Sequence, residues 1–234
     1  MPPFDTSYRN NVSLCSSIVG RPREHDERTA AALLDAAERI VETEGVAALS
    51  VRRVAAEVGT TVRAVYSVFG SKAALLVALG ARTFDWLASA MDALPLTDDP
   101  VADLVEAGTR VFRRLAVEHP ALFRVGFGHG EVPPELTLEF RASAEHALQR
   151  LEARVFRLET EGLLAGRSTR LAVWEFHALC EGLAGLELRG ILGPSDSEQI
   201  WRDALATLLA GLAARPTAAP SASHRSGLQS RGSR

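Results

Sequence analysis

The chain has 234 residues, of which 47% are hydrophobic and 6% aromatic, and its net charge is −3. This length can bury a hydrophobic core, whereas the roughly 20-residue apolar stretch of a membrane span and the basic-then-apolar pattern of a signal peptide are not found. We therefore expect a cytoplasmic protein without a membrane partner. Cys15 and Cys180 make no disulfide framework and fit a reducing compartment.

Charge is distributed unevenly along the chain. Residues 50–72 carry a net charge of +3, whereas residues 73–213 carry −7. A basic segment on an otherwise acidic protein favours contact with DNA through one end only. Most of the acidic residues are equally well explained as ordinary solvated surface.

The first elements in chain order are a tail and a bracing helix. Residues 1–20 are polar and unpatterned, so we predict a disordered tail. Arg21 and Arg23 follow as an arm that either touches DNA or is a solvated leader. A helix over 27–44 then presents a row of apolar residues to the next segment: Leu33, Ala37, Ile40 and Val41.

The segment from 50 to 69 has the spacing of a helix-turn-helix. Ser50 is suited to cap a first helix, and Gly59 can take the left-handed conformation of the tight turn that ends it. Thr61 can cap a second helix. The apolar faces are Val51, Val54, Ala55 and Val58 on the first helix and Val62, Val65, Val68 and Phe69 on the second. In such units the second helix enters the DNA major groove.

The outward side of this unit is short, polar or basic. Thr60, Thr61 and Ser67 offer hydroxyls for phosphates or base edges, and Arg63 suits guanine. Arg52 and Lys72 add positive charge. The alternative is a helical hairpin that packs in a bundle or docks a protein partner.

A family resemblance strengthens the DNA-binding interpretation. Residues 59–72, GTTVRAVYSVFGSK, resemble the signature of TetR-type transcriptional regulators, and the similarity extends over about 25–80. The resemblance implies that Tyr66 and Lys72 touch phosphates and that Thr61, Val62, Arg63 and Ser67 face the groove. Two residues depart from the family pattern. Thr60 replaces a common Val, and Val68 replaces a common His or Tyr, which could remove one phosphate contact.

The remainder of the chain has helical periodicity without strand patterns. A long helix from Lys72 to about Leu94 ends before Pro95 and Pro100. Further helices are predicted over 101–118, from Pro120, and over 134–162, 168–190 and 195–213. The predicted fold is all-α. It comprises a disordered tail (1–20), a three-helix DNA-binding domain (21–72), a helical effector-binding and dimerisation domain (73–213), and a disordered tail (214–234).

The last two predicted helices have apolar faces broader than a one-sided core requires. We expect 168–190 and 195–213 to pair with a second copy as a four-helix contact, with close approach at Gly182 and Gly185. A buried hairpin in a monomer is the alternative. TetR-type regulators pair through their last two long helices, and residues 112–127 resemble the subgroup named for a Trp-His-Gly motif. His177 and Glu181 replace that motif's Trp and His, so only Gly182 of the motif remains.

Catalytic and metal-binding patterns are lacking. No histidine or cysteine pair has metal-ligand spacing, and there is no phosphate loop or nucleophile elbow. We therefore expect no enzyme, metal or cofactor. A small, largely apolar effector could bind within the bundle. The candidate lining residues, which by default are core residues, are Phe84, Phe112, Phe123, Phe127, Phe140, Trp174 and His177.

Together these patterns predict a ligand-responsive homodimeric repressor that binds a palindromic operator in double-stranded DNA. Two alternatives stay open. One is a helical protein-interaction module without DNA binding. The other is a DNA binder switched by oxidation of Cys15 and Cys180.

Overall fold

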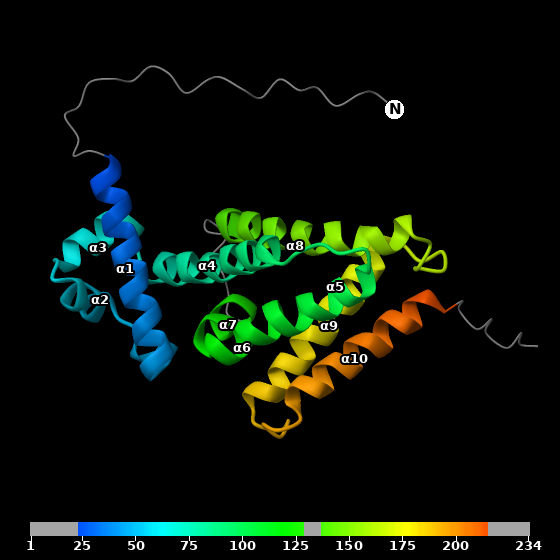
Figure 1. The fold of residues 1–234 in the computed structure, drawn as a ribbon. Coiled ribbons are helices and arrows are strands. Elements are labelled where there is room, and N and C mark those ends of the chain that lie inside the picture. The colour runs from blue at the N-terminus through cyan, green and yellow to red at the C-terminus, as the bar shows by residue number, and fades with distance from the viewer. Residues whose placement is uncertain (1–22, 129–136, 215–234) are drawn as a thin grey trace, which may run out of the picture.

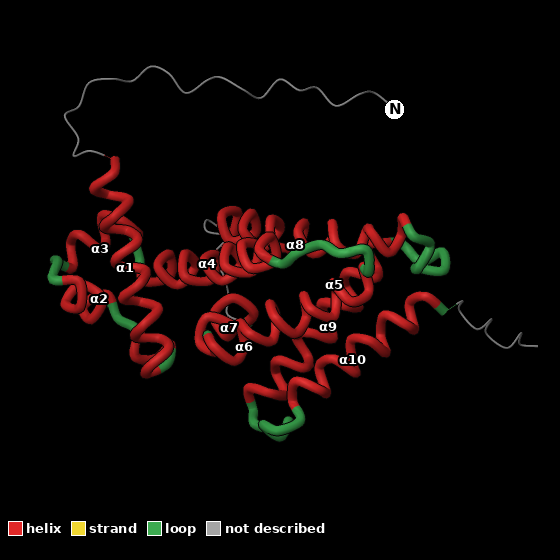
Figure 2. Tube along the Cα trace, in the orientation of Figure 1, coloured by secondary structure: helices red, strands yellow, loops and turns green. Residues whose placement is uncertain are grey.

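The computed structural model describes residues 23–128 and 137–214. Within these ranges the ordered elements are helices and no strand occurs, which confirms the predicted all-α class. The chain forms a small helical cluster at one end, joined to a larger helical body by one long helix (Figures 1 and 2). The predicted tails, 1–20 and 214–234, lie outside the described residues except for Ala214. The predicted DNA-binding domain, 21–72, is described from Arg23 onward.

The N-terminal cluster consists of three helices around one small core. These are α1 (Arg23–Glu44), α2 (Val51–Val58) and α3 (Val62–Phe69), with a short 3₁₀ turn at Val46–Ala48. The predicted bracing residues of α1, Leu33, Ala37, Ile40 and Val41, are buried. Apolar side chains one helical turn apart therefore hold α1 against the next two helices.

The body contains the remaining helices. They are α4 (Lys72–Ala93), α5 (Pro100–Ala107), α6 (Arg113–Glu118), α7 (Pro120–Phe127), α8 (Thr137–Thr160), α9 (Thr169–Leu188) and α10 (Ser197–Ala213). The single helix expected over 101–118 is divided by a π-helical segment, Gly108–Phe112. At Gly108 an added Cβ would lie 2.4 Å from Leu205, so the glycine permits close packing of α10.

The long helix α4 runs beside α8, and both point away from the DNA-binding end (Figure 1). At one end the Phe140 ring lies 5.3 Å from that of Phe84. At the other, the buried Arg154 donates to the carbonyls of Met91 and Leu94 at 2.7 and 2.6 Å. Since the last carbonyls of a helix have no partner within it, Arg154 serves as the C-terminal cap of α4.

One expectation about membranes needs correction. Within the described residues, α4 is long and apolar enough to cross a bilayer by length and composition. Its apolar residues have a different explanation, because Leu75, Leu79, Leu87 and Met91 are buried against neighbouring helices of the body.

Two further expectations concern close approach and cysteine chemistry. At Gly182 an added Cβ would meet nothing within 4 Å, so no part of the same subunit packs against this glycine, and its predicted close approach to a second copy stays a prediction. Cys180 is buried, and burial raises the pKa of its thiol well above the ordinary value. The thiolate is the reactive form, so the structure disfavours oxidation at Cys180, while Cys15 lies outside the described residues.

Candidate DNA-binding surface and ligand cavity

The helix-turn-helix is built from local signals. The Ser50 hydroxyl accepts from the backbone N–H of Arg53 at 3.3 Å, and the Thr61 hydroxyl accepts from Ala64 at 3.2 Å, so each helix is capped by its own sequence. Gly59 lies in the left-handed region (φ 71°), where a side chain would be strained. Ala55 and Val65 are buried where α2 and α3 meet.

The candidate reading surface comprises the outward residues of α3, its N-cap and the first residue of α4, and we define it as Thr61, Val62, Arg63, Tyr66, Ser67 and Lys72. All six residues are exposed, and Tyr66 reaches 50% exposure. Val62 was expected on the apolar side as well, but it is exposed because the core beneath α3 is filled by Val65. Thr60 is half-buried in the turn, and Arg52 is exposed on α2.

The basic residues of this end fall into two groups. Arg53 donates to Glu44 at 2.8 Å and Arg39 donates to Glu57 at 2.9 Å, so these two arginines tie α1 to α2. Arg52, Arg63 and Lys72 have no acidic partner among residues 23–128 and 137–214. Their charge is therefore available to an external anion.

The body contains an inner cavity of about 490 Å³, lined mainly by α4, α8 and α9 and open to solvent at the exposed Arg141, Glu145 and Trp174. Of the seven predicted ligand-binding residues, five line it: Phe84, Phe112, Phe127, Trp174 and His177. Phe140 packs edge-on against Phe84, and Phe123 lines a neighbouring groove, so neither lines this cavity.

The sequence analysis missed the aliphatic and charged part of the lining. Leu87, Met91, Leu148 and Leu151 form the apolar floor, and Arg141 and Glu145 lie exposed at the rim of the inner cavity. The aliphatic residues repeat at helical spacing on α4 and α8, which is the signal that could have identified them.

His177 is the polar group inside the cavity wall. Its ring lies 5.7 Å from Phe112, 5.8 Å from Phe127 and 5.7 Å from Trp174. Burial lowers the pKa of His177, and the carboxylate of Glu181, 3.6 Å away, only partly opposes this. The imidazole is therefore neutral at pH 7 and offers one donor and one acceptor.

Comparisons with known proteins address the family. The sequence model described as bacterial regulatory proteins, tetR family, matches residues 33–79, and a model of the tetracyclin repressor-like C-terminal domain matches residues 105–208. The chain belongs to the tetR family. It is accordingly a DNA-binding transcriptional regulator. No curated protein matches the chain.

Solved structures share the fold of this TetR-family chain at low identity. A protein of unknown function from Rhodococcus sp. RHA1 is 22% identical, with a TM-score of 0.70 over 80% of this chain and 96% of that one. FadR from Bacillus subtilis, solved with stearoyl-CoA, is 16% identical, with a TM-score of 0.61 over 77% and 97%. RolR, solved with resorcinol, is 18% identical, with a TM-score of 0.57 over 82% and 96%.

A polar junction connects the DNA-binding domain of this regulator to the wall of its cavity. The Glu42 carboxylate on α1 accepts the backbone N–H groups of Ala121 and Leu122, both at 3.2 Å. These groups belong to the first turn of α7, which has no cap of its own, because the His119 side chain makes no capping hydrogen bond. Glu42 thus caps α7 from another domain.

A second contact reinforces this junction. Arg82 on α4 pairs with Asp35 and, at 3.2 Å, with Glu38, both on α1. The ring of Trp86 lies 5.7 Å from that of His119. Because α7 ends at Phe127 in the cavity wall, a change in the cavity can reach α1 through a single short helix.

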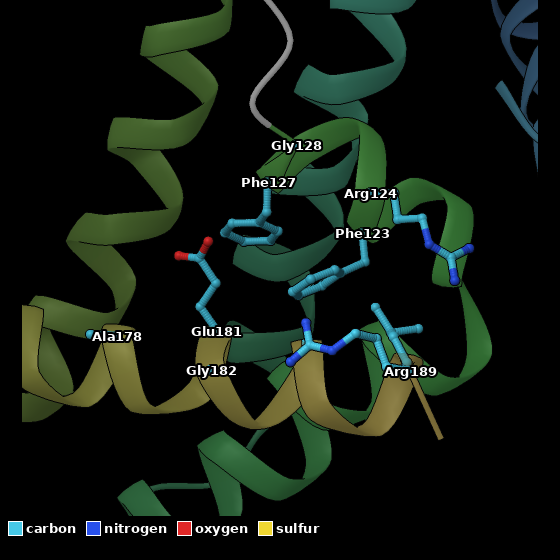
Figure 3. Close-up of a pocket in the computed structure, with 10 residues that line it drawn as sticks. Phe123, Arg124, Phe127, Gly128, Ala178, Glu181, Gly182 and Arg189 are labelled. Carbon is cyan, nitrogen blue, oxygen red and sulfur yellow. The ribbon is translucent and has the colours of Figure 1, made fainter. Parts of the chain in front are cut away.

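A second hollow, the outer groove, lies between α7 and α9 on the surface of the body. It measures about 530 Å³ and is lined by Phe123, Arg124, Phe127, Gly128, Ala178, Glu181, Gly182, Gly185, Leu188 and Arg189. Figure 3 shows the rings of Phe123 and Phe127 above α9, with Glu181 and Arg189 extending from α9 toward them. Nothing in the sequence analysis predicted this groove.

Proposed function

We propose that this protein is a ligand-responsive homodimeric repressor that binds a palindromic operator through two copies of the reading surface. The observation that carries the proposal is the exposure of Arg63 on α3 and of Lys72 at the start of α4, neither of which has an acidic partner in the described residues. Phosphate contacts position such a helix, and side chains such as Arg63 read base edges. We expect the protein to act in the cytoplasm and without catalysis.

Dimerisation is supported by an apolar groove along α9 and α10. Leu179, Ile200, Ala204 and Leu208 line it together with two polar residues, Asp203 and Thr207, and Ile200 is exposed although it is a large hydrophobic residue. A twofold axis there would pair the two helices with their copies. The two reading surfaces would then contact successive major-groove faces about 34–36 Å apart.

The proposed effector site is the inner cavity. Its lining is largely apolar with few polar groups, which is typical of small-molecule sites. The neighbours FadR and RolR were solved with stearoyl-CoA and resorcinol, which supports a ligand in this half of the chain. A ligand that favours a different position of α7 would move α1 through Glu42 and weaken operator binding.

Selection of bound sequences from random duplex DNA tests the proposal. We expect an enriched palindrome, because two identical subunits related by a twofold axis read identical half-sites. Enrichment of a single asymmetric half-site would remove the homodimeric part. No salt-dependent duplex binding at all would favour the alternative, a helical protein-interaction module.

The interface has its own test in Gly182→Leu. A side chain at this position meets nothing within the subunit, so folding should be preserved while a facing copy would be obstructed. We expect monomers by light scattering and unchanged thermal unfolding of the subunit. A dimer of wild-type affinity would exclude this part of α9 from the interface.

A further inference from the structure

Val62 is an exposed apolar side chain at the start of the helix that would enter the major groove. It is the first residue of α3 and is 37% exposed. The other apolar residues of this helix face inward, since Val65 is buried and Val68 and Phe69 pack against the core. Single exposed hydrophobic residues are common on protein surfaces, so the meaning of Val62 depends on its neighbours.

The exposed residues of α3 form two rows, because side chains four positions apart lie on the same side of a helix. Val62 shares one side with the exposed Tyr66. Arg63 shares the adjacent side with the exposed Ser67. The N-terminal residues of a recognition helix are the ones that contact base edges. The two side chains placed to do so here are one apolar and one basic.

The segment from Gly59 to Lys72 lacks the side chains that recognise adenine and cytosine best. Asparagine and glutamine pair with adenine, and carboxylates accept from the amino group of cytosine, but none of these residue types occurs in the segment. The nearest carboxylate in the sequence, Glu57, accepts a hydrogen bond from Arg39 at 2.9 Å. The hydroxyl groups of the reading surface can donate or accept, so they discriminate less.

Two base-specific contacts remain for these residues. The guanidinium of Arg63 only donates, so it matches the O6 and N7 acceptors of guanine. The side chain of Val62 has no polar atom, so it matches the C5-methyl group of thymine. Both residues lie in the first turn of α3, which places both contacts in the same half-site.

We propose that Val62 is a specificity-determining residue that reads the C5-methyl group of a pyrimidine, in the same half-site as the guanine contacted by Arg63. The proposal rests on the proposed function, since it names what the reading surface recognises in the operator. An apolar side chain cannot distinguish the O4 atom of thymine from the amino group of cytosine. The protein should therefore accept 5-methylcytosine in place of that thymine.

Binding to four versions of the selected operator tests this contact. Each thymine of the half-site is replaced in turn by uracil, 5-methylcytosine or cytosine, with the matching purine opposite. The four bases combine the presence or absence of the methyl group with either O4 or an amino group. At one position, 5-methylcytosine should bind within about twofold of thymine. Uracil and cytosine should bind about fourfold more weakly per half-site, which is the value of one buried methyl group.

Two valine variants assign the methyl dependence to its residue. Val62→Ala shortens the side chain and should reduce the difference between thymine and uracil to less than about twofold. Val46 is the matched control, because it is 38% exposed in the turn between α1 and α2, outside the reading surface. Val46→Ala should retain the difference of about fourfold. Thermal unfolding of both variants, measured in parallel, should match that of the wild type.

Four results would overturn the inference. They are a selected half-site without thymine, equal affinity for thymine and uracil at every position, an affinity that follows the amino group instead of the methyl group, and a methyl dependence that survives in Val62→Ala. Each of them leaves operator binding, and with it the proposed function, intact. A protein that selects no duplex sequence would overturn both.

Discussion

The DNA-binding end and the helical body differ in what their cations contact. At the DNA-binding end Arg39 and Arg53 are tied to Glu57 and Glu44 on the inner side, while the cations on the outer side have no partner among the described residues. In the body most arginines bond to carboxylates or backbone carbonyls of the same chain. Arg124 and Arg189 have no such partner among the described residues, and both line the outer groove. In a chain of net negative charge, unpaired cations therefore mark the surfaces suited to external anions.

The sharpest contrast between paired and unpaired cations is that between Arg154 and Arg170. Arg154→Ala should lower the free energy of unfolding by about 3 kcal/mol, because it leaves the carbonyls that end α4 without a donor and opens a buried space. Arg170→Ala, which loses the same charge at an exposed site, should stay within about 0.5 kcal/mol. Urea unfolding of both variants measures the difference, and equal losses would contradict the distinction.

Arg63 tests the cations on the DNA side. Arg63→Ala should weaken operator binding by about 1–3 kcal/mol and relax specificity at one base pair, if the guanidinium reads a guanine. Competition binding with the selected operator and with random duplex measures both effects. An equal loss on both DNAs would reassign Arg63 to a phosphate contact.

The helix-turn-helix could be predicted almost completely from sequence, because its determinants are local. Ser50, Gly59 and Thr61 act on backbone groups within five residues of themselves. The cavity lining could be predicted only in part. Which face of α8 meets α4 is set by contacts such as Arg154 with Met91, 63 residues apart, and periodicity cannot align two distant helices.

The same reason explains the particular errors. Phe123 and Phe140 are aromatic residues at helical spacing, but their helices direct them to the outer groove and to Gly80 instead of the inner cavity. The cap that Glu42 provides to α7 joins residues 79 and 80 positions apart, so no local pattern could reveal it. The outer groove likewise forms only when α7 and α9 pack together.

The junction between the two regions can be broken at Glu42. Glu42→Ala removes the only cap of the α7 N-terminus observed in the described residues and should lower the free energy of unfolding by about 1 kcal/mol. The variant should also bind operator with a reduced response to an effector in the inner cavity, whereas Glu118→Ala, on an exposed ion pair at the end of α6, should respond normally. An unchanged response in Glu42→Ala would remove the junction from the coupling.

The smallest expected effect concerns His177. Burial holds the pKa of His177 below 6.5, so the folded protein binds fewer protons there than the unfolded chain does. The stability that depends on the neutral imidazole is complete above pH 6.5 and is lost as pH falls below that value. Unfolding of His177→Gln between pH 5 and 7 should show a weaker pH dependence than wild type, and identical profiles would contradict the assignment.

The most direct test of the central claim is the salt dependence of operator binding in wild type, Lys72→Ala and Arg53→Ala. Lys72 has no partner in the described part of the chain, so its removal should lower the slope of log K against log salt by about 0.9 per bound subunit. Arg53 is paired with Glu44, so its removal should leave the slope unchanged. Equal slopes in all three proteins would contradict the claim that unpaired cations form the DNA-binding surface.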